Sequence, residues 1–355
     1  MLLGGVLPTP AVALLADGAG AVVSASHNPP EYNGVKFFSD GGKLTDDEEE
    51  AVERLLDEPA APAPGAVTSV AGLEERYVEV VCERFGGRLE GLRVAVDCAN
   101  GAMYRVAPEA FRRLGATVTA VAVSPDLGRI NERCGATDLS LLSRVVGEGG
   151  ADLGVAFDGD GDRMLAVDAE GSEVDGDQIV AILALHLGVD LVAVTQMTNA
   201  GFHRLMQERG VRVVTTDVGD RYVFEALRRE GGVLGGEQSG HVIYLDGHVT
   251  GDGLVAAVLL CRALVETGRS LAESAAVMPR FPQVKMNVPV RTKHLPPALL
   301  ARVEETNSRL SGKGRVLVRP SGTEPVVRVL AEAERKEEAE RLCDSLAAYV
   351  KQELG

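Results

Sequence analysis

The sequence has few basic side chains for its length. Lysine and arginine number 36 against 52 acidic residues, so the formal net charge is -16. A surplus of negative charge this large argues against nucleic acid or an anionic membrane surface as the main partner, because both are negatively charged themselves. A protein of this composition that binds anions must gather its positive charge at particular places.

Cysteine is sparse and long apolar runs are missing. The five cysteines are scattered and form no C-x-x-C pair, which fits a reducing compartment better than a disulfide framework or a zinc site. His186 and Asp190 interrupt the longest apolar candidate, so no membrane-spanning helix is expected. The apolar residues 1–15 precede the first basic residue, Lys36, and contain two prolines, unlike a signal peptide. We therefore expect a cytoplasmic protein without a membrane partner.

Strand-like and helix-like segments alternate along the chain, which indicates an α/β protein. With 355 residues the chain exceeds one typical core, so several domains are expected. Residues 93–157 have a strand–helix–strand–helix–strand pattern, which predicts parallel strands with ligand sites at their carboxyl ends. Residues 178–236 repeat the theme, and a smaller α+β pattern follows.

The pattern divides into four domains. We predict them at residues 1–64, 65–172, 173–278 and 279–355. The first boundary falls in a proline-rich connector, residues 59–65. Just before it, a helix is predicted over residues 45–56. Thr45 and Glu48 have the spacing of a capping box, which satisfies amides of the first helical turn.

Residues 24–38 concentrate reactive side chains between two strand-like runs. This loop holds a hydroxyl at Ser26, an imidazole at His27 and an ammonium group at Lys36. Reacting groups are often carried by loops on rigid elements. Two consecutive prolines and an Asn-Gly turn restrict the backbone, so the loop should hold one shape. The alternative is a proline-rich surface turn whose polar residues have no chemical role.

Asp158, Asp160 and Asp162 alternate with glycines in the segment D-G-D-G-D. Glycines let the backbone curl around a small ion, and hard carboxylate oxygens suit Mg²⁺ or Ca²⁺. An EF-hand loop would need Gly and Glu where this chain has Arg163 and Ala169. Clustered carboxylates repel one another without a cation. The pattern therefore predicts a divalent-metal site rather than a solvated acidic turn, and a nearby phosphate could supply missing ligands.

Two further polar segments follow strand-like runs. Residues 319–325, R-P-S-G-T-E-P, combine a guanidinium group, hydroxyls and a glycine, and Arg328 lies just beyond them. These are the parts of a phosphate cradle, although a turn whose Ser and Thr bond only the backbone is the alternative. Residues 237–241, E-Q-S-G-H, offer polar groups suited to sugar hydroxyls, but this signal is weak alone.

The adjacent serine and histidine also raise the possibility of a hydrolase. No G-x-S-x-G segment surrounds Ser26, and neighbouring side chains in an extended loop usually point apart. A metal site, a nucleophilic hydroxyl and a phosphate cradle together favour phosphoryl transfer, where positioning and charge neutralisation provide most of the catalysis.

Four blocks, in this order, resemble those of the α-D-phosphohexomutase family. They are S-A-S-H-N-P at 24–29, D-G-D-G-D-R at 158–163, G-E-Q-S-G-H at 236–241 and R-P-S-G-T-E-P at 319–325. The resemblance runs from about Leu7 to the C-terminus. It is strongest to bacterial members that interconvert glucosamine 6-phosphate and glucosamine 1-phosphate, which share a segment like residues 130–138. A phosphomannomutase, a phosphoglucomutase and a non-catalytic phosphosugar-binding protein stay as alternatives.

The resemblance implies roles for particular residues. The catalytic set would be Ser26, which carries the phosphoryl group as phosphoserine, with His27, Lys36 and Arg163. The ligands of one Mg²⁺ would be Ser26, through its phosphate, with Asp158, Asp160 and Asp162. The substrate-binding set would be Glu237, Ser239, His241, Arg319, Ser321, Gly322, Thr323 and Arg328.

The resemblance also implies the course of the reaction and the fold. A sugar bisphosphate would turn around in the cleft and return a phosphate to Ser26, so the bisphosphate is the expected intermediate and activator. Three related doubly wound α/β units and a C-terminal α+β domain are expected. Family members begin with a glycine-rich segment that has no counterpart before Leu7, so the first unit should be incomplete. A sheet that lacks strands exposes apolar surface, which favours a homo-oligomer.

Overall fold

The computed structural model describes residues 1–39, 42–56, 65–124, 127–321 and 324–355, and they form two compact units. The larger unit comprises Met1–Met197 and Val211–Val277, and the smaller comprises Thr198–Gly210 and Met278–Gly355. The predicted proline-rich connector lies outside the described residues except for Gly65. Among the described residues, every helix is too short or too polar to cross a bilayer.

The larger unit contains a five-stranded sheet with the order β10-β9-β8-β6-β7. Its strands are β6 (Arg93–Asp97), β7 (Thr117–Val121), β8 (Leu153–Phe157), β9 (Met164–Asp168) and β10 (Glu173–Val174). The accompanying helices are α3 (Leu73–Phe85), α4 (Met103–Arg113) and α5 (Ser140–Gly149). β6 pairs in parallel with β7 and β8, as the alternating pattern predicts. The antiparallel pairing of β8 with β9 makes the chain reverse after residue 157.

A second sheet repeats this arrangement with the order β12-β11-β13-β14. Its strands are β11 (Leu191–Thr195), β12 (Arg212–Thr216), β13 (Leu234–Gly236) and β14 (Val242–Tyr244). The helices are α6 (Gly176–Leu187), α8 (Asp220–Glu230), α9 (Gly253–Thr267) and α10 (Leu271–Ala275). Here too the first strand, β11, pairs in parallel with two neighbours, and the last pair, β13 with β14, is antiparallel. The predicted repetition of the α/β theme is therefore confirmed.

The first part of the larger unit has a small antiparallel sheet of β2 (Ala19–Ser24), β3 (Gly34–Ser39) and β4 (Gly42–Lys43). Around it lie α1 (Thr9–Leu15), α2 (Asp46–Leu55) and the short parallel pair β1 (Leu2–Leu3) and β5 (Thr68–Ser69). The predicted capping box of Thr45 with Glu48 is present. Val23 is 72% exposed and Val35 is 53% exposed, so apolar surface is uncovered as expected. Association between copies stays a prediction.

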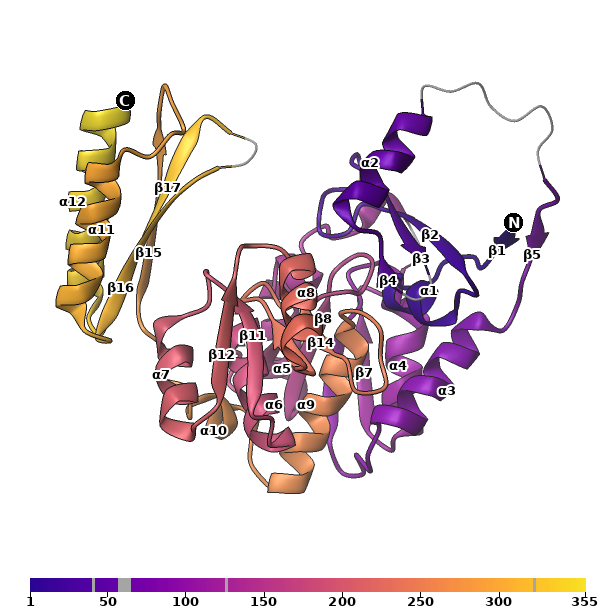
Figure 1. Ribbon diagram of the computed structural model, residues 1–355. Helices are drawn as coiled ribbons and strands as arrows, with labels where there is room; N and C mark the ends of the chain where they lie inside the picture. Colours follow the sequence, from indigo (N-terminus) through magenta and orange to yellow (C-terminus); the bar gives the residue numbers. More distant parts are fainter. Residues whose placement is uncertain (40–41, 57–64, 125–126, 322–323) are drawn as a thin grey trace. The chain divides into compact units, whose positions relative to one another are not determined.

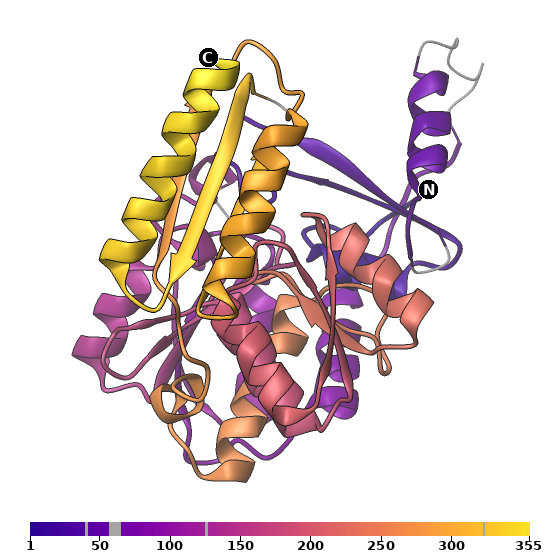
Figure 2. The same ribbon diagram turned by 60° about the vertical axis from the view of Figure 1, so that its left-hand side comes forward.

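The smaller unit is the predicted α+β domain. Its antiparallel sheet has the order β15-β17-β16, formed by β15 (Gln283–Pro289), β16 (Gly314–Pro320) and β17 (Val326–Ala333). Helices α11 (Pro297–Leu310) and α12 (Lys336–Leu354) cover one face of this sheet (Figure 1 and Figure 2). Helix α7 (Ala200–Arg209), which the sequence pattern did not predict, belongs to the same unit. The amide of Ala200 donates to Glu332 Oε2 at 2.9 Å.

Three of the predicted functional loops occupy equivalent places in the larger unit. The loop with Ser26 joins antiparallel β2 and β3, the loop with Asp160 joins β8 and β9, and the loop with Glu237 joins β13 and β14. Each follows a strand end and reverses the chain. All three groups of polar residues therefore lie on turns between antiparallel strands.

Candidate active site

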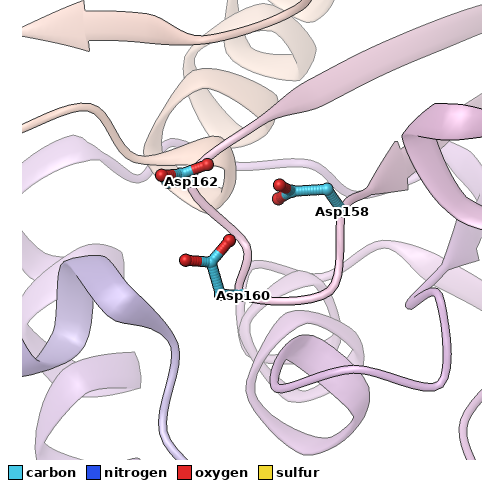
Figure 3. A group of neighbouring side chains, drawn as sticks. All are labelled: Asp158, Asp160 and Asp162. Carbon is cyan, nitrogen blue, oxygen red and sulfur yellow. The ribbon is translucent and has the colours of Figure 1, made fainter. Parts of the chain in front are cut away.

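Three buried carboxylates lie close together in the larger unit. Asp158, Asp160 and Asp162 are 0%, 2% and 4% exposed. One ligand oxygen from each lies within 4.8 Å of the others, and the three side chains converge on one space (Figure 3). The turn that carries them is fixed from within, because the amides of Gly161 and Arg163 both donate to Asp158 Oδ1 at 3.1 Å.

The donor set of this cluster fits a divalent cation. Asp160 Oδ1 and Asp162 Oδ1 are buried and have no hydrogen-bond partner among the described residues. Burial and the neighbouring carboxylates Asp162 and Asp160 raise the pKa of Asp158 well above its usual range. Unsatisfied carboxylate oxygens that crowd one another are stabilised by a hard cation such as Mg²⁺. The residues present therefore meet the requirements of the predicted metal site.

Lys36 reaches this cluster from β3. Its Nζ lies 2.6 Å from Asp160 Oδ2 and 2.8 Å from Asp162 Oδ2. Burial alone would lower the pKa of Lys36, but the two carboxylates outweigh burial and raise that pKa. The side chain therefore stays protonated beside the cluster and supplies positive charge in an acidic protein.

Ser26 lies against the same cluster. Its hydroxyl donates to Asp158 Oδ2 at 3.3 Å, and its Oγ is 3.4 Å from His27 Nδ1. The backbone of the two loops is close enough that a Cβ on Gly159 would fall 2.5 Å from the carbonyl oxygen of Ser26. A glycine is therefore required in the Asp loop for Ser26 to approach.

Arg163 and His27 complete the predicted catalytic set. Arg163 has a buried Nε without a hydrogen-bond partner in the described part of the chain. Partial desolvation and then the charge of Arg163 lower the pKa of His27, so its neutral form is favoured. Ser26 and Lys36 thus contact the Asp cluster, and His27 contacts Ser26 and is affected by the charge of Arg163. The catalytic roles of these residues stay predictions.

The loop between β13 and β14 lies beside the Asp loop, because Arg163 and His241 form a β-bridge and the amide of Met164 donates to the Gly240 carbonyl at 2.9 Å. Glu237 Oε1 accepts from the amide of Gly219 at 3.0 Å. Ser239 donates to Glu237 Oε2 at 3.3 Å, and its own side chain is exposed. A carboxylate held in this way next to an open hydroxyl can bind sugar hydroxyls.

His241 is more enclosed than a surface sugar-binding group would be. It is 3% exposed, with Nδ1 3.7 Å from Asp162 Oδ1 and Nε2 3.4 Å from Asp220 Oδ2. Asp220 also pairs with Lys43. Burial would raise the pKa of Asp220, but His241 and Lys43 lower it to about 2. The imidazole therefore connects the Asp cluster with a second carboxylate, and a direct contact of His241 with substrate stays a prediction.

Two further residues contact this site and were not predicted from the sequence. Thr9 donates its hydroxyl to Asp160 Oδ2 at 2.5 Å, and Asn131 Nδ2 donates to the Ser26 carbonyl at 2.7 Å. The only sequence signal for Thr9 is its position as a polar residue between two prolines in an apolar run. Asn131 lies in the segment 130–138 that carries part of the resemblance, but no local pattern links it with Ser26.

The smaller unit carries the residues that the sequence predicts to form a phosphate cradle. Arg319 and Arg328 are paired positions on β16 and β17, so their side chains emerge on the same face of the sheet. Arg328 Nη2 is 3.4 Å from Ser321 Oγ, and its Nε is buried without a partner among the described residues. Lys293, which the sequence analysis misses, donates to the Ser321 carbonyl at 2.9 Å. Gly322 and Thr323 lie outside the described residues.

Comparison with known protein families identifies the class. Four family descriptions match successive parts of the chain: "Phosphoglucomutase/phosphomannomutase" alpha/beta/alpha domain I at residues 1–62, domain II at 72–171, domain III at 175–281, and the C-terminal domain at 262–348. The chain belongs to this family, the α-D-phosphohexomutases.

The relatives agree with this assignment. The phosphoglucosamine mutase of Saccharopolyspora erythraea is 50% identical, with 98% of this chain and 82% of the relative covered. That of Moorella thermoacetica is 48% identical, with 96% and 82% covered. Among solved structures, a phosphoglucomutase/phosphomannomutase family protein from Burkholderia thailandensis has the same fold, with a TM-score of 0.82, 22% identity, and 99% of this chain and 82% of that chain covered.

Proposed function

We propose that this enzyme interconverts glucosamine 6-phosphate and glucosamine 1-phosphate through a phosphoserine at Ser26 and a sugar bisphosphate intermediate. The observation that carries the proposal is the contact of the Ser26 hydroxyl with Asp158 of the buried carboxylate cluster, at 3.3 Å. A serine hydroxyl beside a cation site is suited to receive a phosphoryl group, because the charge of that group is neutralised where it arrives.

The chain's own residues divide the remaining work. Asp158, Asp160 and Asp162 would hold one Mg²⁺, which supplies positive charge for the oxygens of the phosphoryl group. Lys36 and Arg163 would add positive charge next to the cluster. His27, whose Nδ1 is 3.4 Å from Ser26 Oγ, is placed to take the hydroxyl proton when Ser26 attacks and to return it when the phosphoryl group leaves.

The substrate would be held at both ends. Glu237, Ser239 and His241 would bind the sugar. Arg319, Ser321 and Arg328, together with Gly322 and Thr323, would bind the phosphate that is not reacting, because a paired set of guanidinium groups suits phosphate oxygens. A bisphosphate that turns around presents first one phosphate and then the other to Ser26. The sugar-binding and phosphate-binding residues must therefore accept the substrate in two orientations.

The preference for glucosamine phosphates rests on the relatives named phosphoglucosamine mutase, which are 44% to 50% identical to this chain.

Free cysteines at all five positions fit a cytoplasmic enzyme. A structure of the N-acetylphosphoglucosamine mutase of Aspergillus fumigatus was solved in complex with GlcNAc-6P and magnesium, and its TM-score to this chain is 0.65 at 21% identity, with 97% of this chain and 91% of that chain covered.

The test compares glucosamine, glucose and mannose 1-phosphates as substrates of the purified protein with Mg²⁺ and catalytic glucose 1,6-bisphosphate. We expect the largest kcat/KM for glucosamine 1-phosphate. Intact mass should show about 80 Da added by phosphorylation in the wild type and no addition in Ser26→Ala. A preference for mannose or glucose would assign the chain to another activity of the family, and absence of phosphorylation would favour a protein that only binds phosphosugars.

A further inference from the structure

Asn131 connects the Ser26 loop with a distant part of the chain. Its Nδ2 donates to the carbonyl oxygen of Ser26 at 2.7 Å and to that of Asn28 at 2.9 Å. One amide group thus bridges two peptide carbonyls of the loop. The reversed amide would set Oδ1 against two carbonyl oxygens, so the donor orientation is the one that the surroundings favour.

The backbone that Asn131 holds is in an unfavourable conformation. Ser26 has a φ of 52°, in the left-handed region that residues other than glycine seldom adopt. Such a conformation is strained and persists only where the surroundings impose it. The hydrogen bond from Asn131 acts on the carbonyl of this same residue. It therefore opposes the relaxation that Ser26 would otherwise undergo.

Asn131 is itself anchored. Its φ is 59°, a value that asparagine tolerates better than most residues. Its backbone N–H donates to the Ala99 carbonyl at 2.9 Å. Ala99 lies just after β6 and has a φ of 54°. The loop with Ser26 is therefore fixed to the end of a buried strand of the five-stranded sheet, whereas the strands of the small sheet that carry the loop are mostly exposed or half-buried.

We propose that Asn131 is a positioning residue that holds Ser26 in its left-handed conformation and so directs the Ser26 hydroxyl, and the phosphate it would carry, at the Asp cluster. This inference rests on the proposed function of Ser26. Because the side chain and the carbonyl of Ser26 are attached to one Cα, a displacement of the backbone at Ser26 would move Oγ relative to Asp158. A displacement of about 1 Å can slow an enzymatic step about 100-fold.

Two substitutions separate hydrogen bonding from packing. Asn131→Asp keeps the shape and the tolerance for positive φ but sets a carboxylate oxygen against two carbonyls. Asn131→Gly removes the side chain without backbone strain. Glu132→Gln, at an exposed neighbour, is the control. With glucose 1,6-bisphosphate and Mg²⁺, we expect phosphorylation of Ser26 to be about 100-fold slower in Asn131→Asp and about 10-fold slower in Asn131→Gly, with KM for the sugar phosphate within about 3-fold.

Amide hydrogen exchange of residues 24–31, without metal or substrate, provides a second measurement. Both Asn131 variants should exchange faster there than the wild type and Glu132→Gln, with little change elsewhere in the protein. Phosphorylation at the wild-type rate in Asn131→Asp, or unchanged exchange in both variants, would overturn the inference. If the wild type itself takes up no phosphate, the proposed function fails, and the exchange measurement still decides whether Asn131 holds the loop.

Discussion

Thr9 donates two hydrogen bonds to Asp160, one to its side chain and one to its backbone. The Thr9 hydroxyl donates to Asp160 Oδ2 at 2.5 Å, and the Thr9 amide donates to the Asp160 carbonyl at 2.9 Å. Both residues are buried, with Thr9 1% and Asp160 2% exposed. The start of α1 therefore supports the Asp loop, and a charge-assisted hydrogen bond orients one of its carboxylates.

Substitution Thr9→Val keeps the size of this side chain and removes the donor. We expect the free energy of unfolding to fall by about 1–3 kcal/mol. We expect affinity for Mn²⁺ to fall about 10-fold, because residues that orient a ligand contribute to metal binding. Thermal unfolding and a Mn²⁺ titration would measure these effects. Thr306→Val is the matched control, because the buried Thr306 donates to a carbonyl of its own helix, Arg302, at 2.8 Å. An equal loss of Mn²⁺ affinity in both variants would contradict this role for Thr9.

Features that depend on neighbouring residues could be predicted from the sequence. The capping box at Thr45, the strand over residues 153–157 and the clustering of Asp158 with Asp160 and Asp162 all follow from local spacing. The contact of Thr9 with Asp160 spans 151 positions, and no local pattern contains it. Helix α7 is short, and its hydrogen bond to Glu332 also joins residues far apart in the sequence. Contacts of this kind come from packing, which composition and periodicity do not encode.

The ammonium group of Lys36 contacts carboxylate oxygens that would also bind a metal. Its Nζ lies within 2.8 Å of Oδ2 of both Asp160 and Asp162. Substitution Lys36→Met should therefore lower the free energy of unfolding without Mg²⁺ by up to about 3 kcal/mol, because the carboxylates lose their partner. Added Mg²⁺ should raise the unfolding temperature more in this variant than in the wild type. Thermal unfolding with and without Mg²⁺ tests this.

Lys336→Met serves as the control for Lys36, since Lys336 pairs with Glu340 in the smaller unit and not with the cluster. Its stabilisation by Mg²⁺ should equal that of the wild type. A smaller Mg²⁺ effect in Lys36→Met than in the wild type would show that Lys36 assists metal binding instead of replacing the metal.

Arg319 is the residue whose removal should affect binding most selectively. Its paired position with Arg328 leaves one guanidinium group in the cradle after Arg319→Ala. We expect KM for the sugar phosphate to rise about 10-fold to 50-fold and kcat to stay within about 3-fold, because the distal phosphate is bound equally before and during the reaction. Steady-state kinetics measure both, with the exposed Arg335→Ala as control. A change confined to kcat would exclude this role.

His203 should make the stability of the smaller unit depend on pH. Burial and then the charge of Arg315 lower the pKa of this half-buried imidazole to about 4. In the unfolded chain this histidine has a pKa near 6.5, so as the pH falls it binds a proton at a higher pH than in the folded chain. The contribution of neutral His203 is therefore complete above about pH 6.5 and declines as the pH falls toward 4.

Carboxylates also titrate in this range, so the measured quantity is the difference between wild type and His203→Gln in the free energy of unfolding. We expect this difference to change by about 2 kcal/mol in favour of the variant between pH 7.5 and pH 4.5. His294→Gln, at an exposed histidine, should show little change over the same range. Parallel pH profiles for the wild type and His203→Gln would mean that the folded protein accommodates the protonated imidazole. Movement of His203 away from Arg315, into solvent, would be the simplest physical cause.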